Sequence, residues 1–440
     1  MRVGILGAGV SGMTAAWLLQ RDHEVTLIDA SPKLGGHADT LPVVLDGVTV
    51  HAELGTRFFF DSAYPFFMGL LRILEVPVRW NDARVSFTDL ARSRTIVLPP
   101  ASVRELCSLA SSPRLLRHVL SLRRLVAEQP VIASQRDFST TFRRHLECGR
   151  YPASFGPEFA FPFLAACWGA PLERLPDFPV YSLLKGMPLG TAPGFYEIVG
   201  GMSRYMAAFG RQLRQVHLRL ATRAVGIAHD GDFVVQATDG AHLRFDHLIV
   251  ATSSRDAAAL LRGVPAAAAM REAVGSFRHF ETEIVVHGDR ALMPVDERDW
   301  AHTNIFKDVD TAWMTDWQGL GDRLPVFRTW LPKGRPPPSP RYGGRSFHHL
   351  IMTPENAVLQ RRIATLQGAS GLWVTGMYAA DVDNHESALL SALAPARALA
   401  PGSANLARLL GAVAKGAAHG LEVLPAPFPR GTRHEGARAP

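Results

Sequence analysis

Three glycines near the N-terminus, in the stretch GAGVSG, have the spacing of a phosphate-binding loop. Gly7, Gly9 and Gly12 lie at the junction between a short apolar run, residues 3–6, and residues 11–20, which have the pattern of a helix. In a strand–turn–helix unit the first glycine permits the tight turn, the second lets a pyrophosphate approach the backbone, and the third lets helix and strand pack closely. The phosphates then lie at the positive N-terminal end of the helix.

An acidic residue completes this pattern. A second apolar run, residues 25–28, ends in Asp29, about 20 residues after the middle glycine, where a carboxylate accepts hydrogen bonds from a ribose diol. Glycine-rich turns are common, so GxGxxG alone is weak evidence, but here strand, helix, second strand and terminal acid occur in order. The sequence therefore predicts a βαβ unit of the Rossmann type that binds a dinucleotide.

Length and composition limit the class of protein. A chain of 440 residues is long for one core, so we expect two connected domains. With 47% apolar and 20% charged residues it has a globular composition, and no apolar run approaches the roughly 18 residues of a membrane span. Because the first predicted strand begins at residue 2, no secretion signal is expected, and the expected location is cytoplasmic.

The net charge of +7 does not by itself indicate a nucleic-acid partner. The basic cluster SPRLLRHVLSLRRL places Arg114, Arg117, Arg123 and Arg124 on a predicted helix with leucines between them. This pattern is typical of a solvated helix face, and the alternative is a peripheral contact with anionic lipid. We expect no nucleic-acid binding and no transmembrane segment.

The three cysteines, Cys107, Cys148 and Cys167, form no CxxC pair. They therefore predict neither a disulfide framework nor a zinc site, and no metal site is expected.

Segments of nucleotide-binding type alternate with two insertions along the chain. Strand patterns return after residue 200, ending in the buried run 248–250, and again in WVTGMY near residue 373. The first insertion is helical and rich in aromatics that could line a pocket or fill a core, namely Phe155, Phe159, Phe161, Phe163, Trp168, Phe178 and Tyr181. We expect an α/β fold whose parts are a discontinuous nucleotide-binding domain (1–80, 200–275 and 351–420), a mixed α+β substrate domain (81–199 and 276–350) and a disordered tail (421–440).

These motifs together resemble the flavin-containing amine oxidase superfamily, which includes amine oxidases, protoporphyrinogen oxidase and phytoene-type desaturases. The resemblance covers nearly the whole chain except the tail and rests on GAGVSG with Asp29, on Gly35-Gly36, on ELGTRFF, on the middle VAT and on WVTGMY…HESALLSA. Within the superfamily, DFPVYSLLKGM, VGGMSRYM and NHESALLSA resemble a bacterial branch of predicted FAD-binding oxidoreductases, and a polyunsaturated fatty acid isomerase is a more distant relative. The resemblance implies a GR2-like Rossmann-type FAD-binding domain.

The cofactor implied is FAD, with the adenosine ribose near Lys33, adenine against the backbone of Val225, and the pyrophosphate against the amides of Gly376 and Met377. The helix that opens at Glu386 would stabilise the negative charge of reduced flavin. Carried over motif by motif, the cofactor-binding residues are Gly7, Ala8, Gly9, Val10, Ser11, Gly12, Asp29, Ala30, Ser31, Lys33, Gly35, Gly36, His37, Gly55, Thr56, Arg57, Val225, Ala251, Thr252, Gly376, Met377, Glu386, Ser387 and Ala388.

The chain differs from the family pattern at two positions and lacks two motifs that some members have. The family commonly has arginine where this chain has His37, and more often arginine where it has Lys33. No cysteine lies near the C-terminal motif, so non-covalent FAD is expected, with a histidyl link through His37 as a remote alternative. There is no second GxGxxG, so an NAD(P)H-binding domain is not expected.

Catalytic residues are harder to predict because flavin chemistry needs little from the protein beyond binding, orientation and electrostatics. The candidates are His385 and Glu386 beside the expected flavin, Tyr378, and Lys307, which lies where amine oxidases of the family place a lysine. Asp308 and Asp310 favour a surface turn at Lys307. Trp168, Tyr181 and His302 are further pocket candidates, with a structural role favoured for His302.

The resemblance predicts an FAD-dependent oxidoreductase that removes hydride from a C–H bond of a largely apolar small molecule, by desaturation or amine oxidation. Oxygen or another acceptor would reoxidise the flavin. An aromatic insertion without an obvious arginine cage for a carboxylate motivates the apolar substrate. The alternatives are a redox-neutral double-bond isomerase of a fatty-acid-like substrate and a non-catalytic FAD-binding protein. Monomer and homodimer both stay open.

Overall fold

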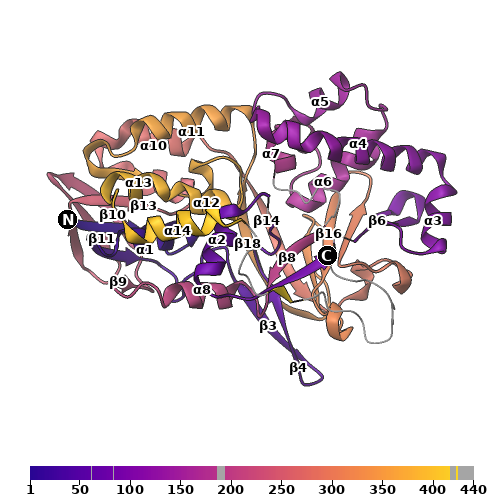
Figure 1. Cartoon of the computed structure of the whole chain (residues 1–440), viewed down its shortest axis with the longest axis horizontal. Helices are drawn as coiled ribbons and strands as arrows, with labels where there is room; N and C mark the ends of the chain where they lie inside the picture. The colour runs from indigo at the N-terminus through magenta and orange to yellow at the C-terminus, as the bar shows by residue number, and fades with distance from the viewer. Residues whose placement is uncertain (61, 83, 186–193, 417–422, 425–440) are drawn as a thin grey trace.

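The computed structural model describes residues 1–60, 62–82, 84–185, 194–416 and 423–424 (Figure 1). Two large sheets organise this part of the chain, one towards each end of the long axis of the molecule in Figure 1. The cavity described below lies where the two sheets and their helices meet.

The first sheet is parallel throughout, in the order β19-β13-β1-β2-β9. Its strands are β1 (Arg2–Leu6), β2 (Glu24–Ile28), β9 (Val216–Arg219), β13 (His247–Val250) and β19 (Leu372–Val374). The apolar runs predicted as buried strands occupy its centre, as expected for parallel strands covered on both faces. The predicted α/β class with a Rossmann-type unit is confirmed.

Helix α1 (Val10–Leu19) lies directly after β1 and has every residue buried. It packs against the C-terminal helices α12 (His385–Ser391), α13 (Leu393–Leu399) and α14 (Ala404–Ala414). Helix α1 and the helices α12 to α14 therefore share one core, and these helices lie towards the left of Figure 1.

Asp46-Gly47 forms the hairpin turn between β3 (Thr40–Leu45) and β4 (Val48–Glu53). Both turn residues have positive φ, 50° and 77°, as a two-residue turn with the right-handed twist of the strands requires.

The second sheet has seven strands in the order β18-β14-β17-β16-β15-β6-β7 and is antiparallel except for the pair β15 and β6. Its strands are β6 (Val85–Asp89), β7 (Arg94–Leu98), β14 (His279–His287), β15 (Thr303–Lys307), β16 (Ala312–Trp317), β17 (Phe327–Leu331) and β18 (Arg341–Leu350). The hairpin of β6 and β7 lies in the segment that was expected to be helical, because its short alternating pattern is weaker than the helical periodicity after it.

Helices from the first insertion cover the second sheet at the right of Figure 1. They are α3 (Val103–Ala110), α4 (Pro113–Gln135), α5 (Phe142–Cys148), α6 (Phe161–Trp168) and α7 (Val180–Lys185). Their core contains a row of stacked or tilted rings from Tyr151, Phe155, Phe159 and Phe163.

The remaining elements complete the two parts. They are α2 (Pro65–Ile73), α8 (Met202–Gly210), α9 (Ser254–Leu260), α10 (Ala268–Gly275), α11 (Pro354–Leu366), β5 (Val78–Asp82), β8 (Gly194–Ile198), β10 (Ala224–Asp230), β11 (Asp232–Ala237), β12 (His242–Phe245) and β20 (Val423–Leu424). The expected disordered tail lies outside the described residues except for Val423–Leu424, which pair with β5.

The first sheet takes its strands from the three segments expected to bind the nucleotide, and the second sheet from the two expected to bind the substrate. The domain boundaries themselves stay a prediction. None of the helices in the described part of the chain has both the length and the apolarity needed to span a bilayer.

Candidate functional site

A cavity of about 1960 Å³ runs from the glycine loop after β1 to the underside of α4. One end is lined by the glycine motifs and the carboxyl ends of the parallel strands, where ligands bind in open α/β sheets. The other end is lined by aliphatic and aromatic side chains of the insertions.

The glycine loop has the close contacts that its spacing predicts. Gly7 has a φ of +109°, and a β-carbon at Gly12 would lie 1.8 Å from the carbonyl oxygen of Gly7. A β-carbon at Gly9 would meet no protein atom within 4 Å, although Gly9 lines the cavity. Helix α1 begins at Gly9 without a side-chain cap, so its first N–H groups are available to a phosphate.

Asp29 lines the cavity at the end of β2, as predicted. Its Oδ2 accepts a hydrogen bond from the N–H of Ala8 at 2.5 Å, and its Oδ1 accepts one from the N–H of Ser31 at 2.7 Å. A carboxylate has about four acceptor positions, so these two bonds orient Asp29 and leave capacity for a ribose diol. The residues present therefore fit a dinucleotide.

A second glycine segment, Gly35-Gly36, lies beside the glycine loop that follows β1. Gly35 forms an isolated parallel β-bridge with Gly9, and Gly35 and Gly36 have φ values of +127° and +60°, which favour glycine. Lys33, in contrast, does not line the cavity, because its ammonium lies 2.5 Å from Oδ1 of Asp39. The structure therefore gives no support to the expected place of Lys33 near the ribose.

The C-terminal motif divides between the cavity and the core. Gly376, Met377 and Tyr378 line the cavity, and so do His385 and Ala388 of α12. Glu386 does not, because its carboxylate accepts hydrogen bonds from the N–H groups of Phe66 and Phe67, both at 2.8 Å, at the start of α2. Glu386 thus caps a helix, which gives it no contact with a molecule in the cavity. Burial raises its pKa to about 7, although the two N–H groups act in the opposite direction.

His385 has an unpartnered polar atom at the cavity wall. Its ring packs edge-on against Phe67 and Tyr205, and its Nε2 is buried without a hydrogen-bond partner among the described residues. Burial, helped by the nearby His37, lowers its pKa to about 3, so the imidazole is neutral. A buried unpartnered ring nitrogen is costly unless a bound molecule pairs with it, which is the strongest single indication of a ligand here.

Two arginines in the cavity wall belong to a buried charge network. Nε of Arg57 lies 2.5 Å from Glu197, and Arg57 and Arg328 both contact Oδ2 of Asp316, at 3.2 Å and 2.8 Å. Although burial opposes it, the guanidinium of Arg57 and the neighbouring ring of His302 lower the pKa of Glu197. Because the two carboxylates balance the two guanidinium groups, the network orders the wall rather than presenting a free cation. The Nε2 atom of His302 accepts a hydrogen bond from the guanidinium of Arg57 at 2.6 Å, and His302 does not line the cavity, consistent with the structural role favoured for it.

Sequence reasoning missed a histidine–carboxylate pair in the wall. His349 Nδ1 lies 3.3 Å from Oδ2 of Asp383, and His37 stacks on the same imidazole with ring centroids 6.4 Å apart. The other oxygen of Asp383 is buried and unpartnered among the described residues. The paired histidines in SFHHL, within an alternating strand pattern, were the available signal, but nothing in the sequence places them near residue 383.

Of the other catalytic and pocket candidates, one lines the cavity and two lie outside its wall. Tyr378 lines the cavity with its hydroxyl buried and unpartnered among the described residues. Lys307 is the last residue of β15, not part of a turn, and its ammonium lies 3.1 Å from Asp89, outside the cavity wall. Tyr181 donates to Asp381 at 2.7 Å and is also outside the wall.

The aromatic insertion contributes mainly core. Of its seven quoted aromatics, Phe163 and Trp168 line the cavity, and the others pack within the second part of the structure. The apolar end of the cavity is built instead from aliphatic side chains of α3 and α4, including Leu109, Val119, Leu122 and Val126.

Most of the expected cofactor residues line the cavity together. They are Gly7, Gly9, Val10, Ser11, Asp29, Ala30, Gly35, Gly36, His37, Gly55, Thr56, Arg57, Val225, Ala251, Thr252, Gly376, Met377 and Ala388. Ala8, Gly12, Ser31, Lys33, Glu386 and Ser387 stand behind this wall. The contact of each with a cofactor stays a prediction.

Comparison with protein families gives the decisive observation. The family model for flavin containing amine oxidoreductases matches residues 10–375. The chain belongs to this family. The cofactor of the flavin-containing amine oxidoreductases is FAD, and their substrates are small molecules. We call the end of the cavity that is lined by the glycine motifs and Asp29 the dinucleotide cradle.

Solved structures show the same fold. A fatty acid isomerase from P. acnes that produces CLA is 14% identical, with a TM-score of 0.64 over 90% of this chain and 98% of that one. Cyclohexylamine oxidase from Brevibacterium oxydans IH-35A is 14% identical, with a TM-score of 0.63 over 91% and 98%. A putrescine oxidase is 13% identical, with a TM-score of 0.62 over 91% and 99%. No curated protein sequence matches the chain.

The two glycines of the loop predict separable defects. Gly12→Ala should destabilise the protein by about 1–3 kcal/mol, because its methyl group would overlap the carbonyl oxygen of Gly7. Gly9→Ala should change stability by less than about 0.5 kcal/mol, because the methyl group enters open space, yet raise the Kd for FAD about tenfold or more. Unfolding of the flavin-free proteins and fluorescence titration with FAD measure both. Wild-type FAD affinity in Gly9→Ala would contradict the assignment of the loop to phosphate.

Glu386 predicts a pH dependence of stability. In the folded protein its carboxyl group stays protonated up to about pH 7, whereas in the unfolded chain it ionises near its ordinary pKa of 4.5. The folded state therefore binds more protons between these pH values, and the contribution of Glu386 to stability falls as pH rises through the window. Relative to Glu386→Gln, the wild type should unfold at progressively lower temperature from pH 5 to pH 8. A difference in midpoint that is constant with pH would refute this.

Proposed function

We propose that the chain is an FAD-dependent oxidoreductase that removes hydride from a C–H bond of a largely apolar small molecule. The observation that best supports this proposal is one cavity that joins the dinucleotide cradle to an apolar end under α4. Its volume of about 1960 Å³ exceeds the roughly 300–1,000 Å³ of an ordinary ligand pocket, which supports room for a cofactor and a second molecule.

The apolar end favours a substrate with a long hydrocarbon part. Leu98, Leu109, Val119, Leu122 and Val126 supply most of its aliphatic wall, and such surface binds by the removal of apolar area from water. The arginines at the junction, Arg57 and Arg328, already pair with Asp316. Their pairing supports an uncharged reacting carbon rather than a carboxylate at that position.

When bound, non-covalent FAD supplies the acceptor for the hydride. The chain must then hold the substrate, exclude water and take up one proton, since removal of two electrons as hydride leaves a proton to be released from the neighbouring atom. His349 is the group we assign to this proton, because its ring lines the cavity and Asp383 can stabilise the imidazolium that forms. Neutral His385 and the hydroxyl of Tyr378 are available to orient the bound molecules.

Desaturation and amine oxidation both satisfy these requirements, with oxygen or another acceptor removing the electrons afterwards. The isomerase alternative is carried by the similarity of fold to a fatty acid isomerase and by the same apolar wall. It differs in returning the hydride to another carbon of the substrate, so no external acceptor is consumed.

The test is anaerobic addition of oleate or dodecylamine to the purified yellow protein. Bleaching of the visible flavin band by oleate would indicate desaturation, and bleaching by dodecylamine would indicate amine oxidation. Because desaturation and isomerisation use similar chains, linoleate is added as a third probe with product analysis. A shifted double bond without oxygen uptake would indicate the isomerase, and no reaction with any probe would favour a non-catalytic flavoprotein.

Leu122→Trp should discriminate the apolar end from the rest of the cavity. The larger ring shortens the apolar end, so reduction by an 18-carbon probe should slow about tenfold or more, while reduction by its 8-carbon analogue changes little. Leu90→Trp, at an exposed position outside the wall, is the matched control. Equal slowing of both chain lengths would show that the hydrocarbon does not lie under α4.

A further inference from the structure

Helices α3 and α4 expose large aliphatic side chains at the rim of the cavity. Their exposed fractions are 77% for Val103, 53% for Leu106, 40% for Leu116, 55% for Leu120 and 57% for Val131. Leu106, Leu116 and Leu120 also line the cavity, so these exposed leucines lie at its rim. Exposed apolar side chains gathered on one face mark an interaction site, whereas isolated ones do not.

The exposed face of α4 lies opposite the side of the helix that packs against the protein. Helix α4 buries its opposite side through His118, Ser121, Leu125 and Ile132. Helix α3 lies at the right edge of the molecule in Figure 1, and α4 runs beside it. The exposed side chains of the two helices are accessible to a partner.

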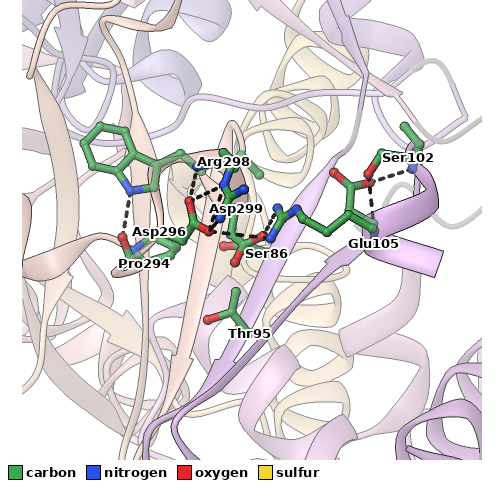
Figure 2. Close-up of polar contacts among 12 residues, drawn as sticks. Ser86, Thr95, Ser102, Glu105, Pro294, Asp296, Arg298 and Asp299 are labelled. Atoms are coloured by element: carbon green, nitrogen blue, oxygen red, sulfur yellow. Dashed lines mark hydrogen bonds and ion pairs between the residues drawn. The ribbon is translucent and has the colours of Figure 1, made fainter. Parts of the chain in front are cut away.

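Helix α3 is tied to other elements by ion pairs: Glu105 pairs with Arg84 at 2.9 Å, and Arg104 pairs with Asp299. The hydroxyl of Ser102 caps the helix by accepting a hydrogen bond from the N–H of Glu105 (Figure 2). Asp296, which Figure 2 shows beside Arg298, lies 3.6 Å from Arg104 as well. Glu105 and Leu109 are the buried residues of α3, whereas Val103 is exposed outside the cavity wall and Leu106 is exposed at the wall itself.

The same face carries positive charge. Helices α3 and α4 contain five arginines against two glutamates, Glu105 and Glu128. Arg104, Arg114 and Arg124 have carboxylate partners, whereas exposed Arg117 and Arg123 form no ion pair with any residue that the structure describes. Both unpaired guanidinium groups belong to the helix that carries Leu116 and Leu120.

We propose that the face formed by α3 and α4 docks on an anionic lipid bilayer, with the cavity opening against the membrane. Aliphatic side chains flanked by unpaired arginines match the interfacial region, where hydrocarbon and phosphate lie within one side-chain length of each other. Arg117 and Arg123 bind lipid phosphates, and the exposed leucines and valines enter the acyl boundary. An apolar molecule could then pass from the bilayer into the cavity; this consequence rests on the proposed function, whereas the docking does not.

The test is co-sedimentation of the full-length flavoprotein with vesicles of phosphatidylcholine alone or of phosphatidylcholine and phosphatidylglycerol at 3:1, without substrate. We expect binding to the anionic vesicles that weakens in high salt. Arg117→Gln/Arg123→Gln should weaken it about 30-fold, at about 1 kcal/mol for each arginine near the surface. Val103→Ser/Val131→Ser, at positions outside the cavity wall, should weaken binding with little change in its salt dependence.

Matched controls lie on the other part of the molecule. Arg211→Gln/Arg214→Gln removes two exposed arginines near α8, and Val44→Ser removes an exposed valine of β3; both should bind vesicles like the wild type. Flavin content and the melting temperature verify that each variant folds.

Three results would overturn the docking. They are no binding of the wild type to the anionic vesicles, equal loss in the control variants, and a dimer in solution that Val103→Ser/Val131→Ser disperses while vesicles are not bound. The last would make the face an interface between copies of the chain. Because no turnover is measured, failure of the proposed reaction would leave these results unchanged.

Discussion

The close approach of Gly12 to Gly7 is the constraint on which the rest of the structure depends. A β-carbon at Gly12 would lie 1.8 Å from the carbonyl oxygen of Gly7, so helix and strand can meet this closely only without a side chain there. The contact points the N-terminus of α1 at the carboxyl edge of the parallel sheet. Asp29, Gly35 and the loop after β19 then converge on the same edge.

The two sheets are formed from segments that alternate along the chain, so the site combines residues that are far apart in sequence. Strands of the first sheet come from the beginning, middle and end of the chain, and the second sheet grows from the insertions between them. Each insertion leaves from and returns to the first part of the structure. The cavity wall can therefore combine the glycine loop with Leu122 of α4 and Trp330 of β17, residues far apart in sequence.

The arginines are paired with carboxylates at one end of the cavity and, among the described residues, unpaired near the other end. Near the junction Arg57 and Arg328 are paired with carboxylates, since an unpaired guanidinium buried there would carry a large desolvation cost. At the rim, Arg117 and Arg123 are exposed to water and need no partner.

The sequence by itself determined the dinucleotide cradle, because its evidence is local. The spacing of Gly7, Gly9 and Gly12 and the position of Asp29 at the end of a strand follow from local backbone geometry, and the structure has them as predicted. The resemblance carried by these motifs also led to the family and its cofactor.

Only the tertiary structure decided which side chains face the cavity. Glu386 and Lys307 looked like catalytic groups, but Glu386 turns to the N–H groups of α2 and Lys307 to Asp89. His349 and Asp383 meet in the wall although no local pattern joins them. The direction of a side chain depends on packing and hydrogen-bond partners brought from other segments, and long-range contacts of this kind leave no periodic signal in the residues that make them.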